Sequence, residues 1–176
     1  PSLFVQRSFI ARHQNPALLI RNALGVNLEK FKPAALPPAA PNLMGLKAIY
    51  AGSLSVRKGI PDLLTAFKTA NLPDISLTLL GGQSTELEDL LKRKPPYVRQ
   101  LGHRPQTELV MHYQQAHCFV IASIEEGMAM VQMQALACGL PLICTTNTGG
   151  EDLLRIQGSP SKDNYQDIQE FPAGFV

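Results

Sequence analysis

Residues 46–80 read LKAIYAGSLSVRKGIPDLLTAFKTANLPDISLTLL, and the fold class can be predicted from them. Residues 46–51 form a largely apolar run that stops at a glycine, which is typical of a buried strand. Residues 61–69 carry apolar side chains at helical spacing and begin with a proline, a residue favoured in the first turn of a helix. Residues 75–80 are again apolar and end at two glycines. The stretch therefore predicts a strand, a helix and a second strand in succession.

The alternation of strands and helices continues toward the C-terminus. Further strands are expected at residues 97–101, 118–122 and 140–144, and further helices at residues 86–93, 107–115, 130–138 and 150–154. Because the expected strands are short and apolar throughout, they suit a parallel sheet that is covered on both faces. We predict an α/β fold with a Rossmann-like, doubly wound parallel sheet, in which ligands bind at the carboxyl ends of the strands.

The N-terminal part of the chain lacks this pattern. Residues 3–12 indicate the end of a helix, and residues 32–42 form an extended connector with four prolines. We expect residues 1–16 to be the end of a preceding N-terminal domain or a linker. Residues 17–176 are expected to form one domain, truncated at its C-terminal end. A first residue other than Met also suggests an excised fragment.

Composition argues against several classes of function. The 176 residues carry a formal net charge of +2, so nothing indicates a nucleic-acid partner. Three cysteines, Cys118, Cys138 and Cys144, lie among apolar or small neighbours without metal-ligand spacing, which predicts buried thiols in a reducing cytoplasm. No apolar run reaches the roughly 20 residues that span a bilayer, and no stretch has the features of a signal peptide. We therefore expect a cytoplasmic protein without a metal site.

The loop after the first expected strand has features of a phosphate-binding site. Residues 52–59 read GSLSVRKG, with a glycine at each end. Arg57 and Lys58 stand next to the start of a helix, whose N–H groups and positive dipole end attract anions. The spacing is not that of a Walker A loop. From these residues alone, a purely structural loop is the alternative.

The loop after residues 118–122 carries two carboxylates, Glu125 and Glu126, followed by Gly127. Glu126 is suited to accept hydrogen bonds from sugar hydroxyls. Unpaired N–H groups near the start of the next helix are candidates for binding a diphosphate or sugar oxygen; they belong to Met128, Ala129 and Met130. Gln134 follows about one turn later and is expected to face the same cleft. The alternative is that the carboxylates only complement the helix dipole. The methionines here are interpreted as core packing.

Four motifs occur in order along the chain. Residues 22–33, NALGVNLEKFKP, are similar to N-G-V-D-x-x-x-F-x-P, and residues 52–59 are similar to G-R-L-x-x-x-K-G. Residues 126–141 are similar to E-G-(x)6-E-A-x-A-C-G-x-P, and residues 148–151 match the G-G-x-x-E/D neighbourhood that follows it. With these motifs the chain, from about Asn22 to its end, resembles the C-terminal donor domain of retaining GT-B-fold glycosyltransferases in the glycosyl transferases group 1 family.

The resemblance implies a role for each motif. Lys58 is expected to bind the diphosphate of a nucleoside-diphosphate sugar and to neutralise the leaving nucleotide. Glu126 is expected to contact the transferred sugar, so these two are the expected catalytic residues. Residues 102–104 resemble the loop that meets the nucleobase, and Gln134 stands where the family contacts the ribose. The other expected donor-binding residues are Gly52, Ser53, Arg57, Gly102, His103, Arg104, Gly127, Met128, Ala129 and Met130.

The resemblance also implies partners. The family transfers a sugar with retention of anomeric configuration and usually without a bound metal, because cationic side chains supply the electrostatic stabilisation. The nucleotide sugar is a substrate, so no cofactor is expected. The acceptor binds to an N-terminal domain of the same polypeptide, and we expect the fragment alone to be inactive. Peripheral membrane association of the full-length enzyme is compatible with the family.

Two positions depart from the family pattern. Ser53 stands where the family commonly has an arginine, and Arg57 is the candidate to replace that charge. Gln134 stands in place of the second glutamate, and it offers one acceptor and two donors instead of a carboxylate. These departures support an alternative, a non-catalytic nucleotide-binding module that kept this half of the GT-B fold. A related phosphorylase or sugar-nucleotide epimerase fits the fold but matches the motifs less well.

Overall fold

The computed structural model describes residues 2–22, 24–36, 38 and 45–154, together with the backbone of residues 170–171 and 174–175. The helices are α1 (Leu3–Ile10), α2 (Ile60–Ala70), α3 (Glu88–Lys92), α4 (Gln106–Gln114), α5 (Met130–Ala137) and α6 (Glu151–Leu154). The strands are β1 (Lys47–Ala51), β2 (Ser76–Leu80), β3 (Val98–Gly102), β4 (Cys118–Ile121), β5 (Leu142–Cys144), β6 (Glu170–Phe171) and β7 (Gly174–Phe175). Each helix and strand expected from the sequence is present, with ends within two residues of the expected ones.

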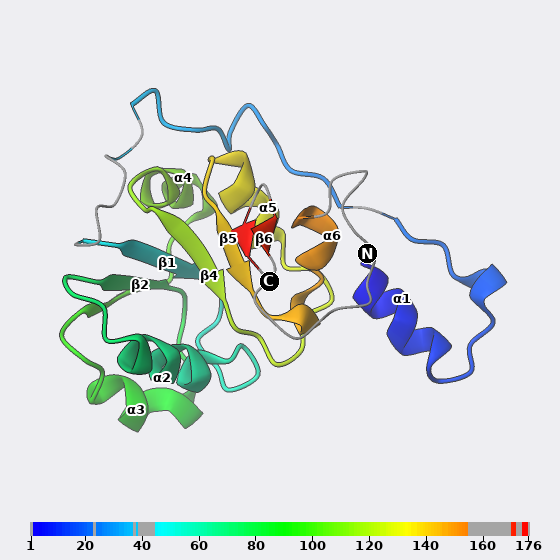
Figure 1. Cartoon of the computed structure of the whole chain (residues 1–176), viewed down its shortest axis with the longest axis horizontal. Coiled ribbons are helices and arrows are strands. Elements are labelled where there is room, and N and C mark those ends of the chain that lie inside the picture. Colours follow the sequence, from blue (N-terminus) through cyan, green and yellow to red (C-terminus); the bar gives the residue numbers. More distant parts are fainter. Residues whose placement is uncertain are drawn as a thin grey trace.

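The strands form one sheet in the order β3-β2-β1-β4-β5-β7-β6. Neighbouring strands are parallel except β6 and β7, which are antiparallel. The chain moves outward from β1 to β3 and then crosses back to β4, on the other side of β1. Figure 1 shows α2 and α3 on one face of the sheet and α4 and α5 on the opposite face. The predicted doubly wound, Rossmann-like sheet is therefore confirmed, and its topological switch point lies between β1 and β4.

The central strands are buried on both faces, as expected for a covered parallel sheet. All four residues of β4 are buried, and so are the last four of β1. The rings of Tyr113 and Phe119 pack edge to face at a centroid distance of 5.9 Å, which joins α4 to β4. Ile143 in β5 is an exception, because it is 42% exposed and lines an apolar hollow of about 430 Å³ beside α2.

The small differences from the expected elements have local causes. Residues 86–93 begin as a 3-10 turn at Thr85–Leu87 before continuing as α3. Strand β5 starts at Leu142, because Pro141 has no N–H to donate to the sheet and joins it only through its carbonyl, which accepts from Phe119 at 2.9 Å. The described part of the connector at residues 32–42 contains no helix or strand; residues 37 and 39–42 lie outside the described part.

The three cysteines are free and buried, as predicted. Burial raises the pKa of the Cys118 and Cys144 thiols to about 11, so both are protonated at neutral pH. The described residues contain no cluster of three or more His, Cys, Asp or Glu side chains that could bind a metal ion. None of the helices in the same part of the chain is long and apolar enough to cross a membrane.

Candidate functional site

The loops that follow β1, β2 and β3 meet at the carboxyl edge of the sheet. The N–H of Gly52 donates to the carbonyl of Leu80 at 2.8 Å, and the N–H of Gly81 donates to the carbonyl of Gly102 at 2.8 Å. These bonds link the three loops in a row. Two of the expected donor-binding positions, Gly52 and Gly102, are thereby placed in one continuous layer of backbone.

Tyr50 supports the first loop from within the core. Its hydroxyl donates to the carbonyl of Ser53 at 2.9 Å, while the side chain of Ser53 is exposed. Burial raises the pKa of Tyr50 well above its ordinary value, although Arg57 lowers it somewhat, so the phenol remains a neutral donor. Tyr50 was not among the site residues expected from the sequence. Its signal was present, because a tyrosine inside an apolar strand usually needs a hydrogen-bond partner for its hydroxyl.

Lys58 and Glu126, the two expected catalytic residues, form an ion pair. The side chains are only 15% and 16% exposed, and they come from loops 68 positions apart in the sequence. Burial lowers the pKa of Lys58 below its ordinary value, and the neighbouring Arg57 guanidinium lowers it further. The structure thus brings a sheltered cation and a sheltered carboxylate together at the switch point of the sheet.

The backbones of the two loops are also tied to each other. The N–H of Ile124 donates to the carbonyl of Arg57 at 3.0 Å, and the Arg57 guanidinium donates to the carbonyl of Glu125 at 3.1 Å. Gly59 has a φ of 66°, and a Cβ atom there would overlap the carbonyl of Ala122. A glycine is therefore required at residue 59 for the loops to approach this closely. Arg57 lies beside Lys58, but part of its hydrogen-bonding capacity holds the second loop.

The start of α5 offers unpaired backbone donors. Ala129 is its N-cap, no side chain caps it, and its first turn contains no acidic residue. Within the described residues, no acceptor is found for the N–H groups of Met128, Ala129 and Met130. Glu125 and Glu126 lie before this turn, and Glu126 is paired with Lys58. Met133 is buried as expected, but the packing role expected for Met130 is wrong, because Met130 is 46% exposed.

A third loop, at Thr145–Gly150, supports the backbone around Glu126. The N–H of Glu126 donates to the carbonyl of Asn147 at 2.8 Å, and the Asn147 amide donates to the carbonyl of Ile124 at 3.1 Å. The Thr145 hydroxyl donates to the carbonyl of Ser123 at 2.7 Å. These supports could not be expected from the sequence, because Asn and Thr in a turn carry no signal of the distant backbone that they contact.

Three further expected residues, Gln134, His103 and Arg104, are not bonded to this centre in the described part of the chain. Gln134 is buried on α5, 4% exposed, and its side-chain carbonyl oxygen has no hydrogen-bond partner within the described residues. His103 and Arg104 follow β3 and are exposed. In the described residues, no hydrogen bond or ion pair joins these three side chains to Lys58 or Glu126.

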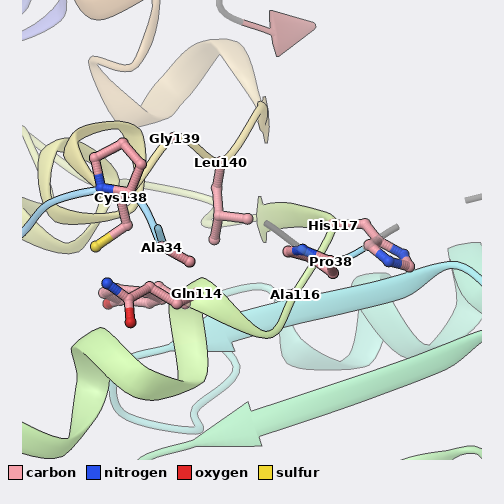
Figure 2. A pocket seen from close by; sticks show the side chains of 10 residues that line it. Ala34, Pro38, Gln114, Ala116, His117, Cys138, Gly139 and Leu140 are labelled. Atoms are coloured by element: carbon pink, nitrogen blue, oxygen red, sulfur yellow. The ribbon is translucent and has the colours of Figure 1, made fainter. Parts of the chain in front are cut away.

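A hollow of about 350 Å³ lies at the other edge of the sheet and is distinct from this site. Figure 2 shows its lining side chains, which come from the connector, from the last turn of α4 and the residues after it, and from the end of α5. His117 in its lining directly precedes β4, and Leu140 shortly precedes β5. Because these positions stand at the amino ends of parallel strands, the hollow belongs to the edge opposite the ligand-binding edge.

Comparison with known proteins places the chain in a family. Residues 45–166 match the model of the family described as glycosyl transferases group 1. The O-antigen chain mannosyltransferase B of Escherichia coli is 28% identical over 128 residues, which cover 68% of this chain and 34% of the relative. The chain thus spans about a third of the length of this curated relative.

Solved structures agree on the fold. The Anabaena protein HepE, in complex with UDP and glucose, superposes with a TM-score of 0.70 at 18% identity, over 88% of this chain and 46% of its own. Sucrose-phosphate synthase from Thermosynechococcus elongatus superposes with a TM-score of 0.69 at 24% identity, over 85% of this chain and 41% of its own. The chain therefore belongs to the glycosyl transferases group 1 family and has the Rossmann-like fold of GT-B glycosyltransferases.

Proposed function

We propose that the chain binds a nucleoside-diphosphate sugar. Together with an acceptor-binding domain N-terminal to it in the same polypeptide, it transfers the sugar with retention of anomeric configuration. The observation that carries the proposal is the sheltered pair of Lys58 and Glu126 at the carboxyl edge of the sheet, beside unpaired N–H groups. HepE, which shares the fold, is described in complex with UDP and glucose, and this supports the choice of ligand class.

The charged and polar groups of the site have separate roles in this proposal. Negative charge grows on the diphosphate as the bond to the sugar breaks, and Lys58 with Arg57 beside it is placed to stabilise that charge. The N–H groups of Met128, Ala129 and Met130 add donors that need no reorganisation. When the donor binds, Lys58 exchanges its carboxylate partner for a phosphate oxygen. Glu126 is then free to accept hydrogen bonds from the sugar hydroxyls.

The outer residues hold the nucleoside in this proposal. Residues 102–104 meet the base, largely through backbone atoms, and Gln134 meets the ribose. The donor enters as a substrate, and the chemistry needs no further cofactor. Since the chain spans about a third of its curated relative, the acceptor and the turnover belong to the full-length protein.

The proposal is tested by ligand-observed NMR with uridine, guanosine and adenosine diphosphate sugars, followed by calorimetry with the best ligand. Lys58→Ala should weaken diphosphate-sugar binding about ten- to a hundredfold, because a charge-assisted hydrogen bond contributes roughly 1.5–3 kcal/mol. Binding of the free nucleoside should change little. Lys68→Ala is the matched control, since Lys68 is an exposed lysine at the far end of α2. An equal loss for both ligands contradicts the diphosphate role.

The second candidate, a non-catalytic nucleotide-binding module, is favoured by Ser53 and Gln134 at positions where the family pattern has charged residues. Both candidates predict donor binding, so only turnover separates them. The full-length protein should release nucleoside diphosphate in an acceptor-dependent manner if it is a transferase. Tight donor binding without release of nucleoside diphosphate, whichever acceptor is added, would favour the binding module.

A further inference from the structure

Helix α1 docks directly onto the loop that carries Glu126. Ser2 is 1% exposed and is the N-cap of α1, where its hydroxyl oxygen accepts from the N–H of Val5 at 3.3 Å. The same hydroxyl donates to the carbonyl of Gly127, 125 positions away in the sequence. Figure 1 shows α1 beside α6 at one end of the molecule. The Ser2 hydroxyl therefore both caps α1 and contacts the loop that carries Glu126.

The bond from Ser2 fixes the direction of a peptide unit in that loop. No cis peptide bond occurs in the described residues, so the carbonyl of Gly127 and the N–H of Met128 point in opposite directions. Because Ser2 holds this carbonyl toward α1, the N–H of Met128 is directed away from α1. On the other side, the N–H of Glu126 is held by Asn147. The backbone that carries Glu126 is thus fixed at both ends.

Two glycines make room for this contact. A Cβ atom on Gly127 would lie 3.0 Å from a methyl group of Val5. Gly149 has a φ of 68°, and a Cβ atom there would lie 2.8 Å from the Cβ of Ser2. A glycine is therefore required at residue 149 where α1 packs, whereas a side chain at residue 127 would make a tight contact with Val5.

Carboxylates of α6 hold the start of α1 in place. The N–H of Leu3, unpaired within its own helix, donates to Asp152 at 2.7 Å. Arg21 pairs with the same carboxylate at 3.1 Å, and Arg7 pairs with Glu151 at 3.7 Å. A carboxylate at a helix N-terminus is favourable to the helix dipole. Several independent contacts therefore set the position of Ser2 against Gly127.

We propose that Ser2 is a positioning residue of the donor site. Through the carbonyl of Gly127 it orients the N–H of Met128 toward the diphosphate and fixes the backbone that carries Glu126. The segment that contains α1 thereby completes the site, and donor affinity depends on how this segment is docked. The inference rests on the proposed function, because it assigns a diphosphate contact to the loop that Ser2 orients.

The test compares Ser2→Ala, Ser2→Thr and Ser8→Ala. Calorimetry measures the affinity for a nucleoside-diphosphate sugar and for the free nucleoside, and urea unfolding measures stability. Ser2→Ala should weaken diphosphate-sugar binding about tenfold and leave nucleoside binding unchanged. Ser2→Thr keeps the hydroxyl and should restore most of the affinity. Ser8 is the control, because it is an exposed serine of α1 that bonds only within the helix, to Val5 at 2.8 Å.

A merely structural role gives a different result. Loss of an N-cap lowers stability but has no reason to change the ratio of the two affinities. The positioning role is overturned if the native protein binds the diphosphate sugar and Ser2→Ala has the same ratio of diphosphate-sugar affinity to nucleoside affinity. If the native protein itself does not bind the diphosphate sugar, the proposed function fails first. Thermal or urea midpoints near the native value exclude simple misfolding as the cause of lost affinity.

Discussion

Helices α2 and α5 both begin at the candidate site, but they bring different groups to it. At α2, Pro61 has no N–H, the N–H of Ile60 makes a long bond of 3.5 Å to Ser55, and Asp62 adds a carboxylate to the first turn. At α5, no acidic residue stands in the first turn, and Met130 leads a turn without a side-chain cap. An anion therefore finds backbone donors at α5 and a side-chain cation, Lys58, beside α2.

The difference shows that a glycine-rich loop followed by a helix is not enough to make a phosphate site from backbone groups. The glycine at residue 59 is required because the loop passes close to Ala122, which is a matter of packing. In the proposed function, the charge of Lys58 binds the phosphate at that loop. At the second loop the backbone N–H groups are proposed to bind it, and the side chains of Met128 and Met130 are not expected to contribute.

Breaking the approach of the two loops should have the largest effect. Gly59→Ala places a Cβ atom in the left-handed region, which costs roughly 1–2 kcal/mol, and the overlap with the Ala122 carbonyl adds to this. We expect a loss of about 3 kcal/mol in the free energy of unfolding, measured by urea denaturation. Gly82→Ala is the control, because a Cβ atom there meets nothing within 4 Å. Similar losses in both variants contradict the close approach.

Removing the charge of Glu126 breaks the ion pair that joins the two loops. Glu126→Gln releases Lys58 from its carboxylate partner, so affinity for the diphosphate sugar should be kept or improved. Turnover of the full-length protein should fall roughly ten- to a hundredfold, because charged hydrogen bonds to the sugar tighten as it develops positive charge. Steady-state kinetics separates the two effects. A raised KM with unchanged kcat assigns Glu126 to ground-state binding only.

Met130→Pro makes α5 resemble α2 by removing one N–H from its first turn. Proline is favoured at this position, and Ala129 before it is already extended, with φ −82° and ψ 119°. Stability should therefore stay near native, while diphosphate-sugar binding weakens about tenfold. Met130→Ala keeps the N–H and should bind like the native protein. Calorimetry of both variants decides whether the backbone or the exposed side chain contributes.

Most of the fold could be predicted because its signals are local. Short apolar runs and apolar side chains at helical spacing mark the strands and helices, and Gly52, Gly81 and Gly139 mark where elements end. The two-residue error at the start of β5 has an equally local cause in Pro141. The exposure of Ile143 was not predictable, because it depends on what covers the far face of the sheet.

The sequence predicts which residues belong to the candidate site, but not which of them contact one another. The motifs predict that Lys58 and Glu126 act on one donor, yet nothing local shows that they pair with each other across 68 positions. The same holds for Ser2, which reads only as a helix cap until α1 is seen against Gly127. Contacts of this kind arise from tertiary packing, which spacing along the chain does not encode.

The smallest expected change in ligand affinity concerns Gln134, which is buried on α5. Its buried carbonyl oxygen has no partner within the described residues, and a buried unpaired acceptor costs about 1–3 kcal/mol. We expect a ribose hydroxyl of the donor to supply the missing partner.

Gln134→Leu removes the unpaired acceptor, so it should leave stability unchanged or higher while abolishing the preference for a nucleoside diphosphate over its 2′-deoxy analogue. Gln134→Glu restores a charged acceptor, which favours the ribose, but it also places a second carboxylate near Glu126 and the diphosphate. These contributions oppose each other, so affinity should stay within about tenfold of native. Titration of all three proteins with both ligands is decisive. If the native protein does not distinguish the two ligands and Gln134→Leu binds as well, the ribose contact assigned to Gln134 is wrong.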